Sequence, residues 1–587
     1  MTFYDSGEFI TAIHSLGSAH SPGYPLFINY AKLFTFVPLG NIAFRVNIAT
    51  AFSAAMACFG VYLLVSHLLR YEDFADDYRL SMFSKRAIAV GTALTFAFTS
   101  RLWLQSNHDK PYPLVSFLGA MIFYLLILWR ERYQKGEERP SYVYLGAFLW
   151  GLSFAAHQTM VLLLPSYVFL ILSMDYRFLK RLKEMFLTAA FGLIGLSVHL
   201  HLPVRAARDP LLNWGDPKTF TQFLWHFLRR GYPVEKPPRN LSIFWSQLKA
   251  FNIPYEFTWA GVALLLIGLC MFFGKRRDEV LAYVIAVIVF LTVIIGCLNT
   301  PSDMIFLTEE FFTPLYLLSA VFIGLGIFSL LKISLAAAPL GKLGAGMSRF
   351  LVTTVVFALP LTVCAINYRE NDQHRNYIAY DYACNTMLPL PKQAVLYTWG
   401  DSGAFPLWYL QGVERMREDL YLVHMPHLCF TWYLDTFPDL FKKSAIRRAE
   451  LNGEPPEKLF LTAVTEQIGN KPVYIDFSTR YSVKLNAFVP WQQGICYRLE
   501  RKTDQMRPIP DLAVWDLYSM RGIDGGMFFR DLDTDKAILI YAYSRMEGGE
   551  TLMSLGYKRE GTLQLMTAER MAPELKPNID LTLGRMK

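Results

Sequence analysis

The chain has 587 residues, of which 53% are hydrophobic and only 18% are charged. Ordinary soluble domains hold about 45–50% apolar and about 25% charged residues, so a wholly soluble protein is excluded. The formal net charge of +8 does not indicate a nucleic-acid partner, because much of the Lys and Arg lies beside apolar runs, as membrane insertion requires. Composition predicts an integral, multi-pass membrane protein that contacts a lipid bilayer and binds no nucleic acid.

Two carboxylates lie close to the first residue of the chain, in the sequence Asp5-Ser6-Gly7-Glu8. Asp5 and Glu8 are three residues apart, a spacing that puts both side chains on one face if a helix begins here. Ser6 or Asp5 could cap that helix, and Glu8 falls where a capping box places an acid. Taken alone, the stretch favours a helix N-terminus.

Ten apolar segments are expected to cross the membrane as helices, since the longer runs can span about 30 Å of hydrocarbon. The run 142–174 has basic residues at both ends, so it must cross twice, with His157-Gln158 as the turn. Basic flanks such as Arg70 to Arg86 and Lys275 to Arg277 mark the cytoplasmic side. The segments are 46–69, 87–104, 113–129, two within 142–174, 185–202, 257–274, 279–298, 311–331 and 350–366.

This topology puts both ends of the chain on the extracytoplasmic side. It divides the chain into a first outer loop at 1–45, a transmembrane domain at 46–366 with an outer loop at 203–256, and a soluble domain at 367–587. An outer N-terminus without a signal peptide predicts that Met1 is not the natural beginning and that a first transmembrane helix precedes Asp5. Unaided translocation of a short N-terminus is the alternative.

The C-terminal part is predicted to be an extracytoplasmic α/β domain, because its charge rises and its apolar runs shorten to strand length. Asp401 follows the first strand, where ligands often bind in open α/β sheets, although Gly400-Asp401-Ser402-Gly403 is also a simple turn. Of the seven cysteines, Cys384, Cys429 and Cys496 lie here and could form one disulfide; the absence of a CxxC pair favours no metal site. The expected strands are 394–399, 419–424 and 471–477, and the expected helices are 405–413 and 439–451.

Four arginines lie in the outer loop, where the positive-inside tendency would disfavour them. Guanidinium forks bind phosphate bidentately, which an outer-face enzyme with a lipid-phosphate donor would need. Pairing with lipid headgroups is the alternative. The four are Arg205, Arg208, Arg229 and Arg230.

Further candidates lie in or near the membrane. His157 is polar in apolar company, and such positions are functional candidates. Asp109, between two spans, could approach a donor site or lie in a solvated turn. Asn213-Trp214-Gly215-Asp216-Pro217 has the composition of a tight turn, in which Trp214 could sit at the membrane interface or stack on a sugar ring, with Asp216 beside it.

An ordered set of motifs is more specific than any one of them. It resembles a GT-C-type membrane glycosyltransferase family that includes the animal endoplasmic-reticulum O-mannosyltransferase of plexin and receptor IPT domains. The likeness covers roughly residues 1–435. The motifs are Asp5-Ser6-Gly7-Glu8-Phe9, the stretch from Ala19 to Leu26, Arg45-Val46-Asn47, Gly151-Leu152 with His157, the stretch from Asn213 to Pro217, and Gly400-Asp401 with Trp408-Tyr409-Leu410.

The resemblance implies a GT-C fold, an inverting transfer from a polyprenyl-phosphate-linked sugar donor, and Asp5 or Glu8 as the catalytic base. It also adds His20 and Tyr24 to the residues that bind the donor or its phosphate. The sequence departs from the family at Ser21, where a second proline is usual, and at Lys110-Pro111-Tyr112, where Glu-Val-Tyr is expected. Asp109 could substitute for the missing acid.

Residues and resemblance agree on one function. A carboxylate is needed to remove the acceptor proton, and arginines or a metal to balance the charge of the leaving phosphate. We expect transfer of mannose or another hexose to a protein or glycan hydroxyl on the outer face, in a bacterial inner membrane since no targeting signal is found. No cofactor is certain, although a divalent cation could take part. A transporter or flippase of lipid-linked glycans, which would show internal repeats, and an inactive relative are the alternatives.

Overall fold

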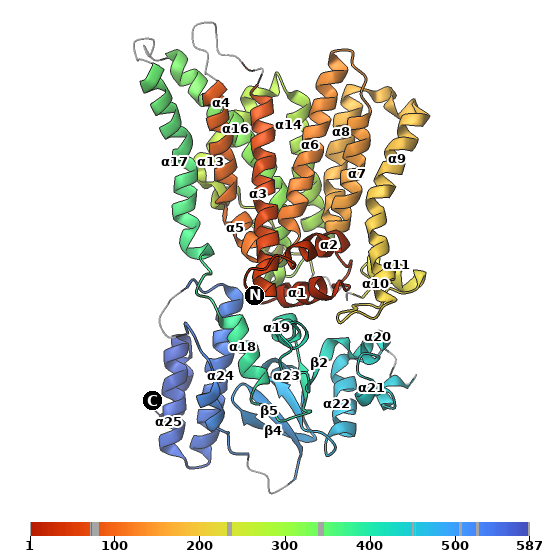
Figure 1. Ribbon diagram of the computed structural model, residues 1–587. Coiled ribbons are helices and arrows are strands. Elements are labelled where there is room, and N and C mark those ends of the chain that lie inside the picture. The colour runs from red at the N-terminus through yellow and green to blue at the C-terminus, as the bar shows by residue number, and fades with distance from the viewer. Residues whose placement is uncertain are drawn as a thin grey trace. The chain divides into compact units, whose positions relative to one another are not determined.

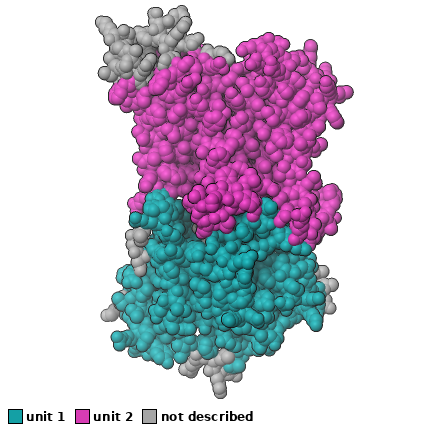
Figure 2. All heavy atoms as spheres, in the orientation of Figure 1, with its two compact units in different colours: residues 1–19, 209–216, 372–587 teal, residues 20–208, 217–371 magenta. Residues whose placement is uncertain are grey.

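The chain forms two compact units, shown in different colours in Figure 2. Unit 1 comprises residues 1–19, 209–216 and 372–587, and unit 2 comprises residues 20–208 and 217–371. This division differs from the expected one, because part of the predicted first outer loop and part of the outer loop 203–256 group with the C-terminal residues. The computed structural model describes residues 2–70, 72, 82–231, 238–337, 345–448, 451, 453–503, 508–523 and 528–584.

Unit 2 is a helical bundle, in which α3, α6, α7 and α9 run side by side (Figure 1). Each of the ten segments expected to cross contains helix. The helices are α2 (Pro25–Phe34), α3 (Ile42–Leu68), α4 (Met82–Ala97), α5 (Ser100–Asn107), α6 (Tyr112–Gln134), α7 (Ser141–Ala156), α8 (Leu164–Met174), α9 (Leu182–Leu196), α10 (His201–Ala206), α11 (Phe220–Phe227), α12 (Leu241–Leu248), α13 (Ile253–Phe273), α14 (Arg277–Leu291), α15 (Ile305–Glu309), α16 (Thr313–Ala337) and α17 (Ala345–Asn371).

The bundle is that of a polytopic helical membrane protein. Among the described residues, six helical stretches are long and apolar enough to cross a membrane, or seven if the bent pair α4–α5 counts as one. Helix α16 is central, since it contacts α13, α4, α6 and α3. The most apolar part of the stretch Ile305–Ser334, which includes most of α16, is 94% buried, against 22% for that of Leu182–Ala206. The total of ten crossings stays a prediction.

The expected span 87–104 is not a straight helix, because α4 and α5 meet at a bend of 64°. That these two helices together form one crossing stays a prediction. The backbone groups that the bend releases have partners inside the unit. Asn367 donates to the Phe98 carbonyl over 2.9 Å, and the buried Glu256 carboxylate accepts the Arg101 N–H over 2.9 Å at the start of α5. The bend therefore depends on side chains more than 150 residues away in the sequence.

The break predicted at His157 is confirmed. Helix α7 ends at Ala156, and a short 3-10 helix, Gln158–Leu163, leads to α8. The His157 Nδ1 accepts the Thr159 N–H over 3.1 Å. Pro165 lies in the first turn of α8, where a proline starts a helix without losing a hydrogen bond.

Unit 1 is built on a five-stranded mixed sheet in the order β2-β1-β3-β5-β4. Strands β2, β1 and β3 are parallel, and β5 and β4 continue the sheet antiparallel. The three predicted strands are present as β1, β2 and β3. The strands are β1 (Val395–Thr398), β2 (Tyr421–His424), β3 (Val473–Asp476), β4 (Phe488–Gln493) and β5 (Cys496–Arg501).

Ten α-helices accompany this sheet in the described part of unit 1. The helix predicted at 405–413 is present, and the turn predicted at Gly400–Gly403 instead begins it, since α19 starts at Asp401. The helix predicted at 439–451 is wrong: one turn of α21 and a 3-10 turn take its place, and residues 449–450 lie outside the described residues. The helices are α1 (Asp5–Ser15), α18 (Ile378–Met387), α19 (Asp401–Gly412), α20 (Thr431–Leu434), α21 (Pro438–Phe441), α22 (Pro456–Gln467), α23 (Phe477–Ser482), α24 (Leu532–Ser554), α25 (Lys558–Met571) and α26 (Lys576–Thr582).

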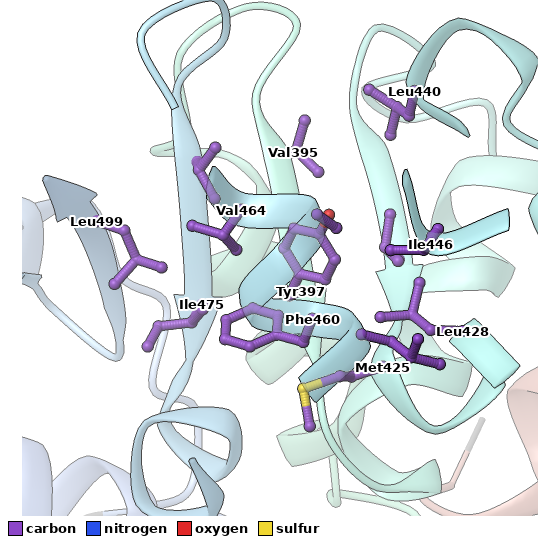
Figure 3. Packing of buried hydrophobic residues seen from close by; sticks show 14 of the residues in the cluster. Val395, Tyr397, Met425, Leu428, Leu440, Ile446, Phe460, Val464, Ile475 and Leu499 are labelled. Carbon is purple, nitrogen blue, oxygen red and sulfur yellow. The ribbon is translucent and has the colours of Figure 1, made fainter. Parts of the chain in front are cut away.

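The main core of unit 1 lies between one face of the sheet and α22. In Figure 3, Tyr397 of β1 and Phe460 of α22 lie at its centre, with ring centroids 5.0 Å apart. The buried Tyr397 hydroxyl donates to Gln467 over 2.8 Å, which satisfies a polar group that would otherwise be costly inside a core. All seven cysteines are free, so the disulfide left open above does not form.

Candidate functional site

The predicted carboxylates lie on α1, in unit 1. The helix begins at Asp5, as its motif predicts, but Tyr4 occupies the N-cap position and no side chain accepts a capping hydrogen bond. Glu8 is fully buried (0% exposed), and Asp5 is half-buried. Because carboxylates are rarely buried unless they have partners, Glu8 is not the solvated acid of a capping box.

Helix α1 lies against α19, because Gly7 allows a close backbone approach. A Cβ at Gly7 would stand 2.2 Å from the carbonyl oxygen of Phe405. The residues after α1 pair with the segment 209–216: the Ser18 N–H donates to Leu212 over 2.9 Å, and the Trp214 N–H donates to Ser18 over 3.1 Å. These contacts explain why the first nineteen residues group with the C-terminal part.

Tyr4 links α1 to two other helices of unit 1. It forms a side-chain hydrogen bond with Asp533 of α24 and lies near Asp401 of α19 and Asp5. Burial and these three carboxylates raise the pKa of Tyr4, so its phenol stays a neutral donor. The position of the α1 N-terminus, and so of Asp5, is therefore set by side chains from distant parts of the chain.

The second predicted motif, from His20 to Pro25, forms a tight turn in unit 2 before α2. The Ser21-Pro22 bond is cis, and Gly23 has φ +95°, a conformation that favours glycine. A Cβ at Gly23 would also stand 2.6 Å from the Leu202 side chain. The turn brings His20 Nε2 and the Tyr24 hydroxyl to 2.9 Å, so these two predicted donor-site residues lie together.

His157 lies in an aromatic setting that includes this turn. Its ring centroid is 5.6 Å from that of Tyr24, 4.9 Å from Tyr112 and 5.3 Å from Phe311. Three basic residues are close enough to act on it electrostatically: His20, Lys110 and Arg229. The histidine–tyrosine cluster of unit 2 comprises His20, Tyr24, Tyr112, His157 and Phe311.

Asp109 and Lys110 do not lie in a solvated turn, which corrects that alternative. Asp109 is 0% exposed, and the Asn47 amide, turned with its nitrogen toward Asp109, donates to it over 2.8 Å. Lys110 donates to both oxygens of Glu310 over 2.7 and 2.8 Å, and both side chains are less than 10% exposed. The departure from the family pattern at Lys110 is thus part of a buried ion pair.

The four predicted arginines lie in or just after two short helices, α10 and α11. Arg205 belongs to α10 and acts electrostatically on Lys32, whereas Arg229 lies near His157. Arg208 and Arg230 are exposed just beyond α10 and α11. Of the four, Arg229 acts electrostatically on His157 of the histidine–tyrosine cluster.

The turn predicted at 213–217 is confirmed. The Asn213 amide donates to Asp216 over 2.7 Å, and Gly215 has φ +75°, so Asp216 closes the turn. Trp214 is buried in an aromatic–histidine cluster of unit 1. Its members are Trp214, Phe405, Trp408, His424, His427, Phe430 and Trp432.

Sequence reasoning missed two features of the candidate site. Glu310 has a signal in the sequence, since Glu309-Glu310 is a pair of acids at the start of an apolar run, where ionisable residues are functional candidates. His424 and His427 end and follow a strand, and nothing local distinguishes them from core histidines. Burial lowers the pKa of His424 to about 3 and that of His427 well below its usual value.

Two family models match the chain. The description "Protein O-mannosyl-transferase TMEM260 N-terminal domain" matches residues 5–180, and "TMEM260-associated domain 2" matches residues 379–455. The resemblance expected from the motifs is confirmed. The first TMEM260 match contains both carboxylates, the turn from His20 to Pro25, Lys110 and His157, and the second contains the start of α19 and His424.

Two relatives are also named protein O-mannosyl-transferase TMEM260. The chain is 25% identical over 550 residues to protein O-mannosyl-transferase tmem260 of Dictyostelium discoideum, covering 85% of this chain and 64% of the relative. It is 28% identical over 453 residues to TMEM260 of Mus musculus, covering 73% of this chain and 60% of the relative. The chain thus spans less than two thirds of the length of these relatives.

Solved structures of glycosyltransferases are distantly similar. ArnT from Cupriavidus metallidurans, bound to undecaprenyl phosphate, matches with a TM-score of 0.47 and 12% identity, covering 85% of this chain and 94% of that one. The Archaeoglobus fulgidus oligosaccharyltransferase AglB matches with a TM-score of 0.43 and 10% identity, covering 98% of this chain and 82% of that one.

Proposed function

We propose that the chain is a GT-C-type membrane glycosyltransferase, which transfers mannose or another hexose from a polyprenyl-phosphate-linked donor to a protein or glycan hydroxyl. The observation that carries the proposal is the pair of carboxylates on α1: Glu8 is fully buried, and the backbone contact between Gly7 and Phe405 fixes the helix that holds it. The names of the TMEM260 relatives support the same activity.

Asp5 is the better candidate for the base. It is half-buried, so part of its carboxylate can reach a substrate, whereas Glu8 is fully buried. In the proposed reaction the acceptor hydroxyl gives its proton to Asp5, its oxygen forms a bond to the anomeric carbon, and the bond from that carbon to the donor phosphate breaks. A single displacement of this kind inverts the anomeric centre. Glu8 acts as a positioning residue.

The leaving polyprenyl phosphate gains negative charge and needs a counter-charge. Arg229 is our candidate for this counter-charge, because it acts electrostatically on His157 of the histidine–tyrosine cluster. A divalent cation could share this role, and the carboxylate oxygens of Asp5 and Glu8 are the ligand type that Mg²⁺ and Mn²⁺ prefer. Loss of transfer with a chelator, and its recovery with one of these ions, would support a cation.

The location follows from the charge distribution. We propose that the chain crosses the membrane ten times and that α1 and the sheet of unit 1 act on the extracytoplasmic face. The bacterial inner membrane stays a prediction. The transporter alternative differs in one respect, because a transporter moves the intact donor lipid without breaking its sugar–phosphate bond.

The experiment is transfer of radiolabelled mannose from polyprenyl-phosphate mannose, by purified protein in detergent, to a protein acceptor or an oligosaccharide. Release of polyprenyl phosphate together with a labelled acceptor supports the proposal. Movement of intact donor across vesicles without cleavage would support the transporter instead.

A further inference from the structure

The carboxyl ends of the parallel strands of unit 1 bring together ionisable and aromatic side chains that the proposed transfer does not use. His424 is the last residue of β2. Asp401 begins α19, shortly after β1 ends at Thr398. Strands β1 and β2 are parallel neighbours. This edge of a parallel sheet is where ligands bind in open α/β folds.

Aromatic rings surround this edge. The Trp214 ring centroid is 4.4 Å from that of His427, 6.2 Å from Trp408 and 6.3 Å from Trp432. Phe430 stacks on Trp432 at 5.9 Å with an angle of 18° between the rings. Trp408, Phe430 and Trp432 are half-buried, so part of each ring faces outward.

Two buried polar atoms of the cluster have no hydrogen-bond partner within the described residues. They are Nε2 of His424 and Nε1 of Trp432. The His424 side chain is 2% exposed, and its Nε2 lies 4.0 Å from an oxygen of Asp401, too far for a hydrogen bond. Leaving a buried donor or acceptor without a partner costs about 1–3 kcal/mol, so a ligand that reaches these two atoms gains from bonding to them.

The chemistry of the cluster indicates the ligand. Aromatic walls with a few polar groups bind a compact ligand that has both an apolar face and hydroxyl groups, which is the description of a pyranose ring. A phosphate-bearing ligand is disfavoured, because the carboxylate of Asp401 lies beside His424 and burial keeps both histidines neutral.

We infer that the aromatic–histidine cluster of unit 1 is a binding site for a neutral hexose ring. A half-exposed tryptophan face covers the C–H face of the sugar, and its hydroxyls bond to His424 Nε2, Trp432 Nε1 and Asp401. That this hexose is mannose, of a glycan acceptor or of the product, rests on the proposed function. The binding of a neutral pyranose does not.

The test is saturation-transfer NMR on the full chain in detergent, without donor lipid, using methyl α-D-mannopyranoside as the probe. The parent should show transfer to the sugar ring protons at about 10 mM probe, the range of weak sugar affinities. Trp432→Ala should weaken binding at least about tenfold, and Trp432→Phe less, because it keeps one aromatic ring while losing the N–H and part of the indole face.

Trp491→Ala is the matched control, since Trp491 is a half-buried tryptophan on β4, at the far edge of the same sheet, and its Nε1 is also without a partner. If Trp432→Ala lowers the melting temperature more than Trp491→Ala does, Trp408→Phe tests the same surface with a smaller change. Binding that is absent in the parent, or equally weakened in Trp491→Ala, overturns the inference. Tighter binding of mannose 1-phosphate than of the neutral probe would also overturn the inference.

These outcomes are independent of the proposed function. Probe binding that requires Trp432, in a protein that transfers no sugar, would support the inference and contradict the function. Sugar transfer by a protein that does not bind the probe would support the proposed function and contradict the inference.

Discussion

Gly7 of α1 lies so close to α19 that a Cβ at this position would stand 2.2 Å from the carbonyl oxygen of Phe405. The obstacle is backbone, which cannot rotate away as a side chain can. The one helix that carries both predicted carboxylates is therefore held by a contact that only glycine permits.

Gly7→Ala should separate α1 from α19 and cost about 1–3 kcal/mol of stability, as overpacking does. Sugar transfer should fall by more than the loss of folded protein explains, because Asp5 and Glu8 move with the helix. Gly274→Ala is the control, since a Cβ there meets nothing within 4 Å. Melting temperature and transfer rate check the prediction, and a Gly7→Ala protein that matches the parent in both would contradict it.

The buried pair of Lys110 and Glu310 supports a second prediction. Lys110→Met leaves the Glu310 carboxylate buried without its partner and should destabilise the chain by about 3–5 kcal/mol. Lys110→Glu, which restores the acid expected from the family pattern, should be worse because it places two carboxylates together. The exchange Lys110→Glu with Glu310→Lys should recover much of the loss in thermal melting. An exchange variant no more stable than Lys110→Glu alone would show that the pair contributes nothing.

Stability should depend on the ionisation of Asp476, the last residue of β3. Burial raises its pKa from 3.8 to about 6, so the folded state binds a proton more tightly than the unfolded state. The tighter proton binding stabilises the folded state by about 3 kcal/mol. This contribution to the free energy of unfolding is fully present below about pH 4 and is lost as the pH rises through 6. Asp476→Asn stays neutral and can still accept the Thr479 N–H, as Asp476 does.

The measure is the difference in stability between parent and Asp476→Asn at pH 4 and at pH 7. Buried His424, whose pKa is lowered to about 3, destabilises the folded state as the pH falls, and it does so equally in both proteins. The stability of Asp476→Asn relative to the parent should therefore increase as the pH rises. A difference that does not change with pH would contradict the raised pKa.

The sequence predicted those parts of the fold that depend on neighbouring residues in the chain. The start of α1 at Asp5, the break at His157 and the strands β1, β2 and β3 follow from helix spacing, a polar interruption and short apolar runs. The bend between α4 and α5 does not, because Glu256 and Asn367 stabilise it from distant positions.

The candidate site was predicted in pieces for the same reason. His20 and Tyr24 lie within one turn and were found together, whereas Lys110 and Glu310 are 200 residues apart, and no periodicity reports their pairing. Trp214 was recognised as part of a turn and as a ring that could stack on a sugar, but its neighbours were not predicted. Its contact with His427 depends on the packing of the segment 209–216 into unit 1.

Topology can be tested with two single cysteines, after the exposed Cys270, Cys297 and Cys429 are changed to serine. Lys392→Cys, exposed before β1, should react with a membrane-impermeant maleimide in intact cells. Lys135→Cys, exposed in the basic turn after α6, should react only after permeabilisation. The reverse pattern would place unit 1 in the cytoplasm and contradict the proposed orientation.

The most direct test of the central claim is transfer of labelled mannose from polyprenyl-phosphate mannose by Asp5→Asn and Glu8→Gln. The exposed Asp439→Asn is the matched control in the same unit. Loss of a general base should lower the rate about 10²–10⁴-fold in Asp5→Asn, and Glu8→Gln should also be slower, while Asp439→Asn transfers at the parent rate. Asp5→Asn and Glu8→Gln proteins that fold and transfer as well as the parent would contradict the assignment of the reaction to the carboxylates of α1.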